Sequence, residues 1–224
     1  MPDIVDEKYY EAVPPKGMAE RLLIAARDRI YRDFIQSMKP SPEDTILDVG
    51  VSDVINDGAN VLERRYEPKR QIVACGIGEA LEFQAEFPDI RYVRIEPNKR
   101  LPFKDGQFDI ATANAVLEHV GSRDKQKFFV SELCRVAKRV FISVPHRYFP
   151  VEHHTALPIL HYWDSTFRLA CALTGKHKWA LEENLILMSR RRLLDVVPPG
   201  RRAEIRPTGL KLGPFSSNLY LSIG

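Results

Sequence analysis

Short apolar runs alternate with amphipathic stretches through the middle of the chain. Each run is four to seven residues long and is too apolar to be a strand with one solvated face, so it predicts a strand of a parallel sheet that is covered on both faces. The runs cover residues 46–49, 71–77, 108–113 and 140–144, and residues 91–95 are expected to form a further short strand. The sequence therefore predicts an α/β fold.

Helices are predicted where apolar residues recur at steps of three and four. The leading helix covers 17–38, and it ends before Pro40 and Pro42. The other expected helices cover residues 61–66, 79–87, 164–174 and 189–196, and one that begins at Asp124 as its N-cap. Two strands, 203–208 and 218–223, joined by a long loop, end the chain. Residues 1–16 are expected to form a loose arm before a single domain.

The segment 45–60 is expected to organise the ligand site. Its apolar run ends at Gly50, a polar turn follows, and a helix begins at residue 61. In folds of this kind, ligands bind outside the carboxyl ends of the strands. Gly50 lets the backbone approach a ligand closely because it has no Cβ. Asp48 is expected at the lip of the pocket.

This segment, together with 107–120 (QFDIATANAVLEHV) and 140–145, resembles the class I S-adenosylmethionine-dependent methyltransferases of the small-molecule, type 11-like branch. The resemblance implies a Rossmann-like, mostly parallel seven-stranded sheet with helices on both faces and an antiparallel C-terminal strand. It also implies the cofactor S-adenosyl-L-methionine and methyl transfer to a small-molecule, sugar or lipid-linked glycan acceptor. The family's later glycines are missing after Gly50, and Gly78 stands where an acid is usual.

The resemblance also implies roles for individual residues. Asp48, Gly50 and Val51 belong to the cofactor motif. Glu79 either binds the ribose or is a first-turn acid of the next helix, where the helix dipole favours it. Glu96 either meets the adenine or is a solvated loop acid. Three further residues are expected where the sulfonium meets the acceptor, although the last could equally pack beside the strand: Asn114, Glu118 and His119.

Residues 146–200 are interpreted as an acceptor-side insertion. The segment that follows the strand 140–144 carries Glu152, His153, His154 and His161. Histidine titrates near neutrality, so His154, His153 or Glu152, with His119, could remove a proton from an acceptor hydroxyl. The spacing of these side chains matches no established ligand pattern, so no metal is expected. Four aromatic residues are interpreted as the wall or lid of a pocket: Tyr148, Phe149, Tyr162 and Trp163.

Composition narrows the alternatives. The 224 residues carry a net charge of +3, too little to indicate nucleic-acid binding. Three scattered cysteines argue against disulfides and against zinc, and they suit a reducing cytoplasm. The acidic N-terminus does not predict a signal peptide, and no apolar run is long enough to span a bilayer.

Two other functions compete with methyl transfer. The altered motif leaves open a non-catalytic member of the fold that serves as a binding or scaffold protein. A nicotinamide-dependent oxidoreductase would need a G-x-G-x-x-G fingerprint, which the chain lacks, and a parallel C-terminal sheet.

Overall fold

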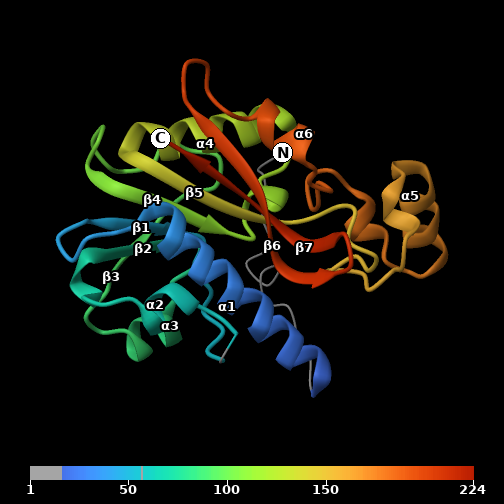
Figure 1. The fold of residues 1–224 in the computed structure, drawn as a ribbon, viewed down its shortest axis with the longest axis horizontal. Helices are drawn as coiled ribbons and strands as arrows, with labels where there is room; N and C mark the ends of the chain where they lie inside the picture. Colours follow the sequence, from blue (N-terminus) through green and yellow to red (C-terminus); the bar gives the residue numbers. More distant parts are fainter. Residues whose placement is uncertain (1–16, 57) are drawn as a thin grey trace.

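The computed structural model describes residues 17–56 and 58–224, so the predicted arm at 1–16 lies outside the described residues. One seven-stranded sheet runs in the order β3-β2-β1-β4-β5-β7-β6 (Figure 1). Strands β1 to β5 are parallel, and β7 lies antiparallel to both β5 and β6. The strands are β1 Ile46–Val49, β2 Ile72–Gly76, β3 Arg91–Arg94, β4 Phe108–Asn114, β5 Ala137–Pro145, β6 Ala203–Leu212 and β7 Phe215–Ile223. The predicted Rossmann-like architecture is confirmed.

Helices cover both faces of this sheet. They are α1 Met18–Met38, α2 Val61–Arg65, α3 Leu81–Glu86, α4 Arg123–Val136, α5 Asp164–Leu173 and α6 Arg190–Asp195. Short 3-10 turns occupy η2 Lys69–Gln71, η3 Leu117–His119, η4 Leu160–Tyr162 and η5 His177–Ala180. Helices α1 to α3 lie on one face, and α4 and α6 on the other; α5 stands at one end of the molecule (Figure 1).

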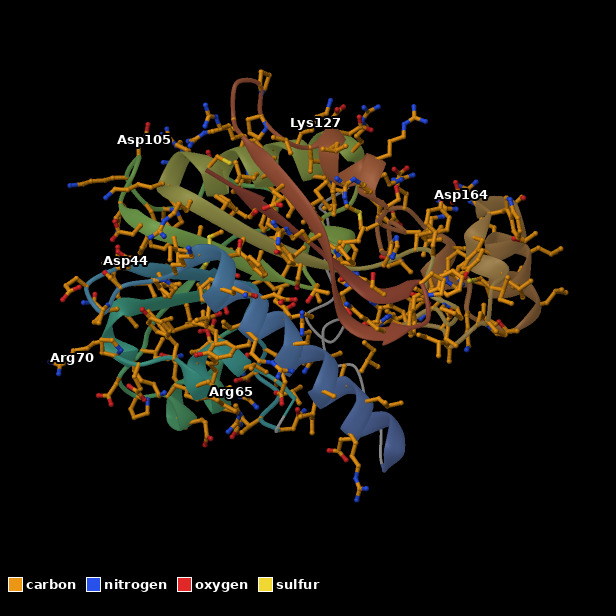
Figure 2. The ribbon with its side chains drawn as sticks, in the orientation of Figure 1. Asp44, Arg65, Arg70, Asp105, Lys127 and Asp164 are labelled. Atoms are coloured by element: carbon orange, nitrogen blue, oxygen red, sulfur yellow. The ribbon has the colours of Figure 1, made fainter. Side chains whose placement is uncertain are left out.

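Each face of the sheet has its own apolar core. On the α1 side, Phe141 of β5 meets Phe34 edge-on at 5.4 Å and stacks on Tyr220 at 4.9 Å between ring centroids. On the α4 side, Val130 and Leu133 are fully buried against β4 and β5. Charged residues such as Arg70, Asp105, Lys127 and Asp164 lie at the periphery (Figure 2). Burial on both faces explains why the sequences of the central strands β1, β4 and β5 are mostly apolar.

The C-terminal strands differ from the prediction. They form a long hairpin that turns at Gly213, and the predicted long loop is wrong. The prediction ended this strand at Thr208, before Gly209, because glycine weakens strand interiors. Pro207 and Gly209 are both tolerated because β6 is the edge strand and its register shifts between Thr208 and Lys211.

Three smaller predictions can be compared with the structure. Ser122, and not Asp124, caps α4 by accepting a hydrogen bond from the amide of Lys125. All three cysteines are buried and free, as expected. No helix in the described part of the chain has the length and apolar character needed to cross a membrane.

Candidate functional site

The turn after β1 requires glycine at position 50. Gly50 has φ +97°, in the left-handed region that side chains disfavour. A Cβ there would lie 2.3 Å from Cγ2 of Val116, on the segment that leaves β4. The backbones after β1 and β4 therefore approach each other closely, and only glycine permits this approach.

A side chain holds the loop where the family's later glycines are missing. The amide of Ser52 donates to Oδ1 of Asn60 at 3.0 Å, and Nδ2 of Asn60 donates to the carbonyl of Ser52 at 2.8 Å. Asn60 adopts φ +49°, a conformation that asparagine tolerates better than most residues. The loop is thus closed by a reciprocal clamp instead of by glycine turns.

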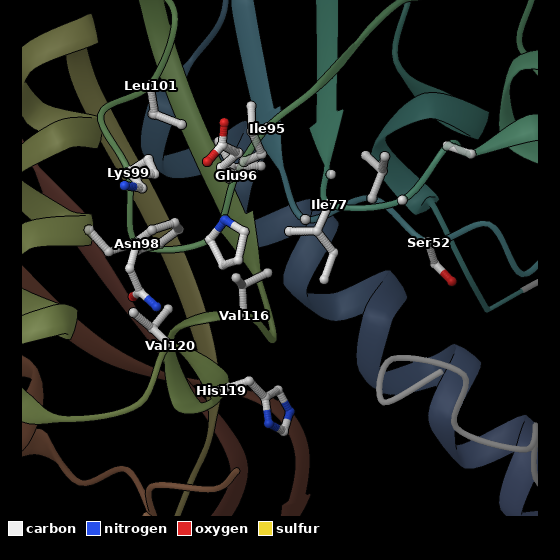
Figure 3. Close-up of a pocket in the computed structure, with 18 of the residues that line it drawn as sticks. Ser52, Ile77, Ile95, Glu96, Asn98, Lys99, Leu101, Val116, His119 and Val120 are labelled. Atoms are coloured by element: carbon white, nitrogen blue, oxygen red, sulfur yellow. The ribbon is translucent and has the colours of Figure 1, made fainter. Parts of the chain in front are cut away.

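A cavity of about 380 Å³ opens at the carboxyl ends of β1, β2 and β3 (Figure 3). This is the position at which open α/β sheets bind ligands, and the volume is within the range of small-molecule sites. In Figure 3, Glu96 and His119 lie at opposite ends of the displayed lining, with Asn98 and Val116 between them. The cavity is therefore long enough to connect two chemically different ends.

Four of the predicted cofactor residues line this cavity: Gly50, Val51, Glu79 and Glu96. Glu79 precedes α3 and is not part of it, so the first-turn interpretation fails. Its carboxylate is exposed and forms an ion pair with Arg94. Glu96 is also exposed, directly after β3. Both acids therefore lie at the rim of the cavity, beside open solvent.

The other three predicted cofactor residues lie elsewhere. Asp48 faces α2 behind the loop, where its carboxyl group lies beside that of Glu63. Asn114 is exposed at the end of β4 and accepts a hydrogen bond from Ser143. Glu118 is buried and borders a small second pocket instead of the main one. The sequence predicted that all three residues bind the cofactor, but none of them lines the main cavity.

The Asp48–Glu63 pair shares a proton. Burial, followed by the charge of Asp48, raises the pKa of Glu63 well above its usual range. Burial also raises the pKa of Asp48 to about 6. Two neighbouring buried carboxyl groups cannot both ionise readily, so Glu63 retains its proton at neutral pH.

Residues from two distant segments form a buried imidazole cluster at one end of the cavity. His119 comes from η3 after β4, and His154 comes from the loop after β5; their Nε2 atoms are 3.1 Å apart. Nδ1 of His154 lies 2.8 Å from Oε1 of Glu152, and Nδ1 of His119 lies 2.8 Å from the carbonyl oxygen of Asn184. Of these residues, His119 lines the main cavity.

Hydrogen bonds determine where charge resides in this cluster. Burial alone would keep Glu152 protonated, but hydrogen bonds from His154 and Thr155 outweigh it and lower the pKa of Glu152 to about 2. Burial, and then the charge of His154, lowers the pKa of His119 to about 4. For His154, burial is outweighed by the bond to Glu152, so its pKa is raised. In the protein alone, His154 is the protonated ring and His119 the neutral one.

Glu118 lies beside this cluster with no donor. Its side chain is 1% exposed, and neither oxygen has a hydrogen-bond partner within the described part of the chain. Burial raises the pKa of Glu118 to about 7. One ligand atom each from Glu118, His119 and His154 can be chosen within 4.8 Å of one another, a grouping that could hold a metal ion.

The remaining acceptor-side residues do not line the main cavity. His153 is exposed, with its ring 5.9 Å from that of Phe149. His161 is buried and hydrogen-bonded to the carbonyl of Phe149. The aromatic side chains mostly contact one another, as in the pair Tyr148 and Tyr162 at 5.7 Å, so the predicted aromatic wall is not part of this cavity.

Sequence reasoning missed several lining residues. Tyr92 of β3 donates to the carbonyl of Gly78 at 2.6 Å and shapes the floor near β2. Asn98 follows Glu96 in the loop after β3, and Glu132 reaches the cavity from α4. A polar residue close to a strand's carboxyl end was the available signal for Asn98; nothing in the sequence pointed to Glu132.

The comparisons agree with this geometry. Residues 59–140 match the model of a family described as "Methyltransferase domain". A SAM-dependent methyltransferase from Aquifex aeolicus has a similar structure, with a TM-score of 0.58 at 16% identity over 97% of each chain. Magnesium protoporphyrin IX methyltransferase from Synechocystis PCC 6803, with bound SAH, gives 0.57 at 12% identity, over 97% of this chain and 90% of that one.

A third similar structure is a SAM-dependent methyltransferase from Thermotoga maritima, described as a possible histamine N-methyltransferase. It has a TM-score of 0.54 at 15% identity, over 91% of this chain and 93% of that one. No curated protein sequence shows significant similarity to the chain. At these identities the solved structures establish the fold, and their acceptors differ too much from one another to indicate the acceptor here.

Proposed function

We propose that this chain, a class I S-adenosylmethionine-dependent methyltransferase by its fold and by its methyltransferase domain, methylates a small hydroxyl-bearing acceptor such as a sugar. The observation that carries the proposal is the cavity itself. It begins beside the close approach at Gly50, and it ends at His119, a member of the buried polar cluster.

The lining fits the cofactor. Gly50 and Val51 offer an approachable backbone next to β1, and Glu79 and Glu96 offer carboxylates at the rim after β2 and β3. We assign the adenosine end to the Glu79 and Glu96 side and the sulfonium end to the Gly50, Val116 and His119 side. The methyl group on the sulfonium is already activated, so the cofactor supplies the difficult chemistry. The protein's task is to align the acceptor and exclude water.

The acceptor side supports a polar substrate. His119 is the one predicted catalytic residue that lines the main cavity, and His154 and Glu152 stand behind it in a chain of hydrogen bonds. A hydroxyl group at this end would meet imidazole and carboxylate groups that are already oriented. His153, which is exposed, has no place in this arrangement.

Thermal unfolding with S-adenosylhomocysteine tests the cofactor assignment. At a concentration a hundred times its Kd, this product adds about 2.7 kcal/mol of stability. For a chain of this size that corresponds to a rise in Tm of roughly 5–10 °C. Gly50→Val should remove the rise, because any Cβ at this position meets Val116. If millimolar ligand leaves the wild-type Tm unchanged, the methyltransferase proposal fails and the scaffold alternative gains support.

A labelled-methyl assay against a panel of sugars, phenols and amines then tests the acceptor class. We expect transfer to hydroxyl-bearing compounds. Transfer to amines alone, with full cofactor binding, would contradict the hydroxyl assignment while leaving the enzyme assignment intact.

A further inference from the structure

The two histidines of the cluster use the same nitrogen, Nδ1, to donate a hydrogen bond. A carbonyl oxygen can only accept, so Nδ1 of His119 must donate its hydrogen to Asn184. Glu152 accepts from the amide and Nδ1 of His154 and from Thr155, so Nδ1 of His154 is a donor as well. The two Nε2 atoms face each other 3.1 Å apart. In the protein alone a proton on one ring bridges this contact, and a cation that binds both nitrogens would replace that proton.

The surroundings of each ring are those of a metal ligand. A histidine that binds a metal typically donates its other N–H to a carboxylate or a backbone carbonyl, which fixes the ring and its tautomer. His154 has the carboxylate of Glu152, and His119 has the carbonyl of Asn184. The amide of Ile186 also donates to the carbonyl of Glu118 at 2.8 Å, so the segment 184–186 holds η3 in place.

The third ligand is a carboxylate with nothing else to bind. Glu118 is 1% exposed, and both of its oxygens lack a donor among the described residues. Buried polar groups without partners are rare in proteins, and each one needs an explanation such as an ion. A cation bound to both histidines would supply that partner.

We propose that Glu118, His119 and His154 bind one divalent transition-metal ion, and that this ion receives the hydroxyl oxygen of the acceptor. The proposal rests on the proposed methyltransferase function and identifies how its acceptor is held. Imidazole ligands favour zinc and its first-row neighbours over magnesium or calcium. The sequence had predicted no metal because the loop after β5 was considered alone; the two other ligands come from the segment after β4.

The distances suit one ion. With metal–nitrogen bonds of about 2.0–2.1 Å, nitrogens 3.1 Å apart subtend about 95–102° at the metal, between the octahedral and tetrahedral angles. The ring planes cross at 86° with centroids 4.8 Å apart, so the rings meet at an angle instead of end to end. One carboxylate oxygen of Glu118 lies within 4.8 Å of a nitrogen of each ring.

Three protein ligands leave positions open, as in catalytic metal sites. His119 borders the main cavity, so an open position can face the acceptor. A metal-bound hydroxyl loses its proton more readily, since a bound ion acts as a Lewis acid. The acceptor's O–CH3 bond then forms as the S–CH3 bond breaks; that bond's electron pair stays on sulfur, and the hydroxyl proton leaves to water.

The test is zinc binding by tag-free, chelator-treated protein, followed by titration calorimetry and metal analysis. We expect one zinc per wild-type chain and at least a tenfold loss of affinity in His154→Ala and in Glu118→Gln. His177→Ala removes an exposed histidine of η5 and should bind zinc like the wild type. A wild-type chain that binds no zinc, or His154→Ala binding it normally, would overturn the proposal.

Two further measurements distinguish loss of metal binding from misfolding and from loss of cofactor binding. Cobalt titrated into the wild type should give visible ligand-field bands, which needs no variant and so cannot be confused with misfolding. The Tm rise with S-adenosylhomocysteine should persist in Glu118→Gln. If wild-type protein binds S-adenosylhomocysteine and transfers methyl groups after chelation but binds no zinc or cobalt, the metal proposal fails and the methyltransferase proposal stands.

Discussion

Two glutamates in this molecule are buried to the same degree and have different neighbours. Glu63 on α2 is 0% exposed and Glu118 on η3 is 1% exposed. Neither has a hydrogen-bond donor for its oxygens within the part of the chain that the structure describes. Glu63 faces another carboxyl group, that of Asp48, whereas Glu118 lies beside the imidazoles of His119 and His154.

The difference shows how the neighbour decides what a buried acid does. Next to Asp48, Glu63 retains its proton, and the pair forms a structural contact with a single negative charge behind the loop of β1. Next to two imidazoles whose nitrogens converge, Glu118 can share a positive charge and take part in binding. Burial alone therefore does not indicate that an acidic side chain binds a ligand. Burial next to two oriented imidazole nitrogens, as for Glu118, favours that role.

The largest expected effect is on turnover. His154→Ala should lower the methyl-transfer rate by about 10²–10⁴-fold, the range seen when a side chain that activates a reacting group is lost. S-adenosylhomocysteine should bind with unchanged affinity, because His154 does not line the main cavity. Single-turnover rates and calorimetry separate the two effects. Normal turnover in this variant would return the imidazole cluster to a structural role.

A smaller loss is expected for the residue behind His154. Glu152→Gln keeps the shape but removes the charge that orients the ring, and changes of this kind cost about 10–100-fold in activity or metal affinity. Thr155→Val, which removes one of the donors to Glu152, should have a weaker effect in the same direction. Measuring kcat for both variants shows whether Glu152→Gln has the larger effect. Equal kcat values for Glu152→Gln and the wild type would contradict the prediction.

The Asp48–Glu63 pair should affect stability instead of rate. Because the pKa of Glu63 is raised by folding, the folded state favours its protonated form, and wild-type stability falls as pH rises above about 4.5 toward the raised value. A tenfold difference in proton affinity between the folded and unfolded states corresponds to about 1.4 kcal/mol of stability. Glu63→Gln cannot ionise, so its Tm relative to the wild type should increase from pH 5 to pH 8. A constant difference across this range would mean that the pair does not hold a proton.

The smallest effect is expected at an exposed acid. Glu79→Ala should weaken S-adenosylhomocysteine binding by about 1 kcal/mol, roughly fivefold in Kd, since an exposed carboxylate gains little from one hydrogen bond. Its partner Arg94 lies on the same rim. Calorimetry against Glu82→Ala, an exposed acid of α3 outside the lining, supplies the control. An unchanged Kd would remove Glu79 from the cofactor site.

The sequence predicted the sheet well because its strands are buried on both faces. Strands β1 and β4 read as unbroken apolar runs, and Gly50 marked the turn that the close approach of Val116 requires. Strand β6 was cut short at Thr208 because Gly209 is an exception that an edge strand tolerates.

The site was predicted only in part because it depends on contacts between distant segments. His119 and His154 were each identified, but their contact joins residues 35 positions apart. Nothing in the sequence distinguishes Glu63, because its contact with Asp48 depends on how α2 packs on the sheet. The Ser52–Asn60 clamp is a side-chain substitute for glycines, and no motif describes it.

A crystal structure with S-adenosylhomocysteine tests the central claim most directly. The claim is that the cavity holds the cofactor with its sulfur toward the imidazole cluster. We predict adenine density beside Glu96 and the sulfur beside Gly50, Val116 and His119. Ligand bound outside this cavity, or with its sulfur at the Glu96 end, would contradict the account, because the acceptor groups would then have no methyl group to receive.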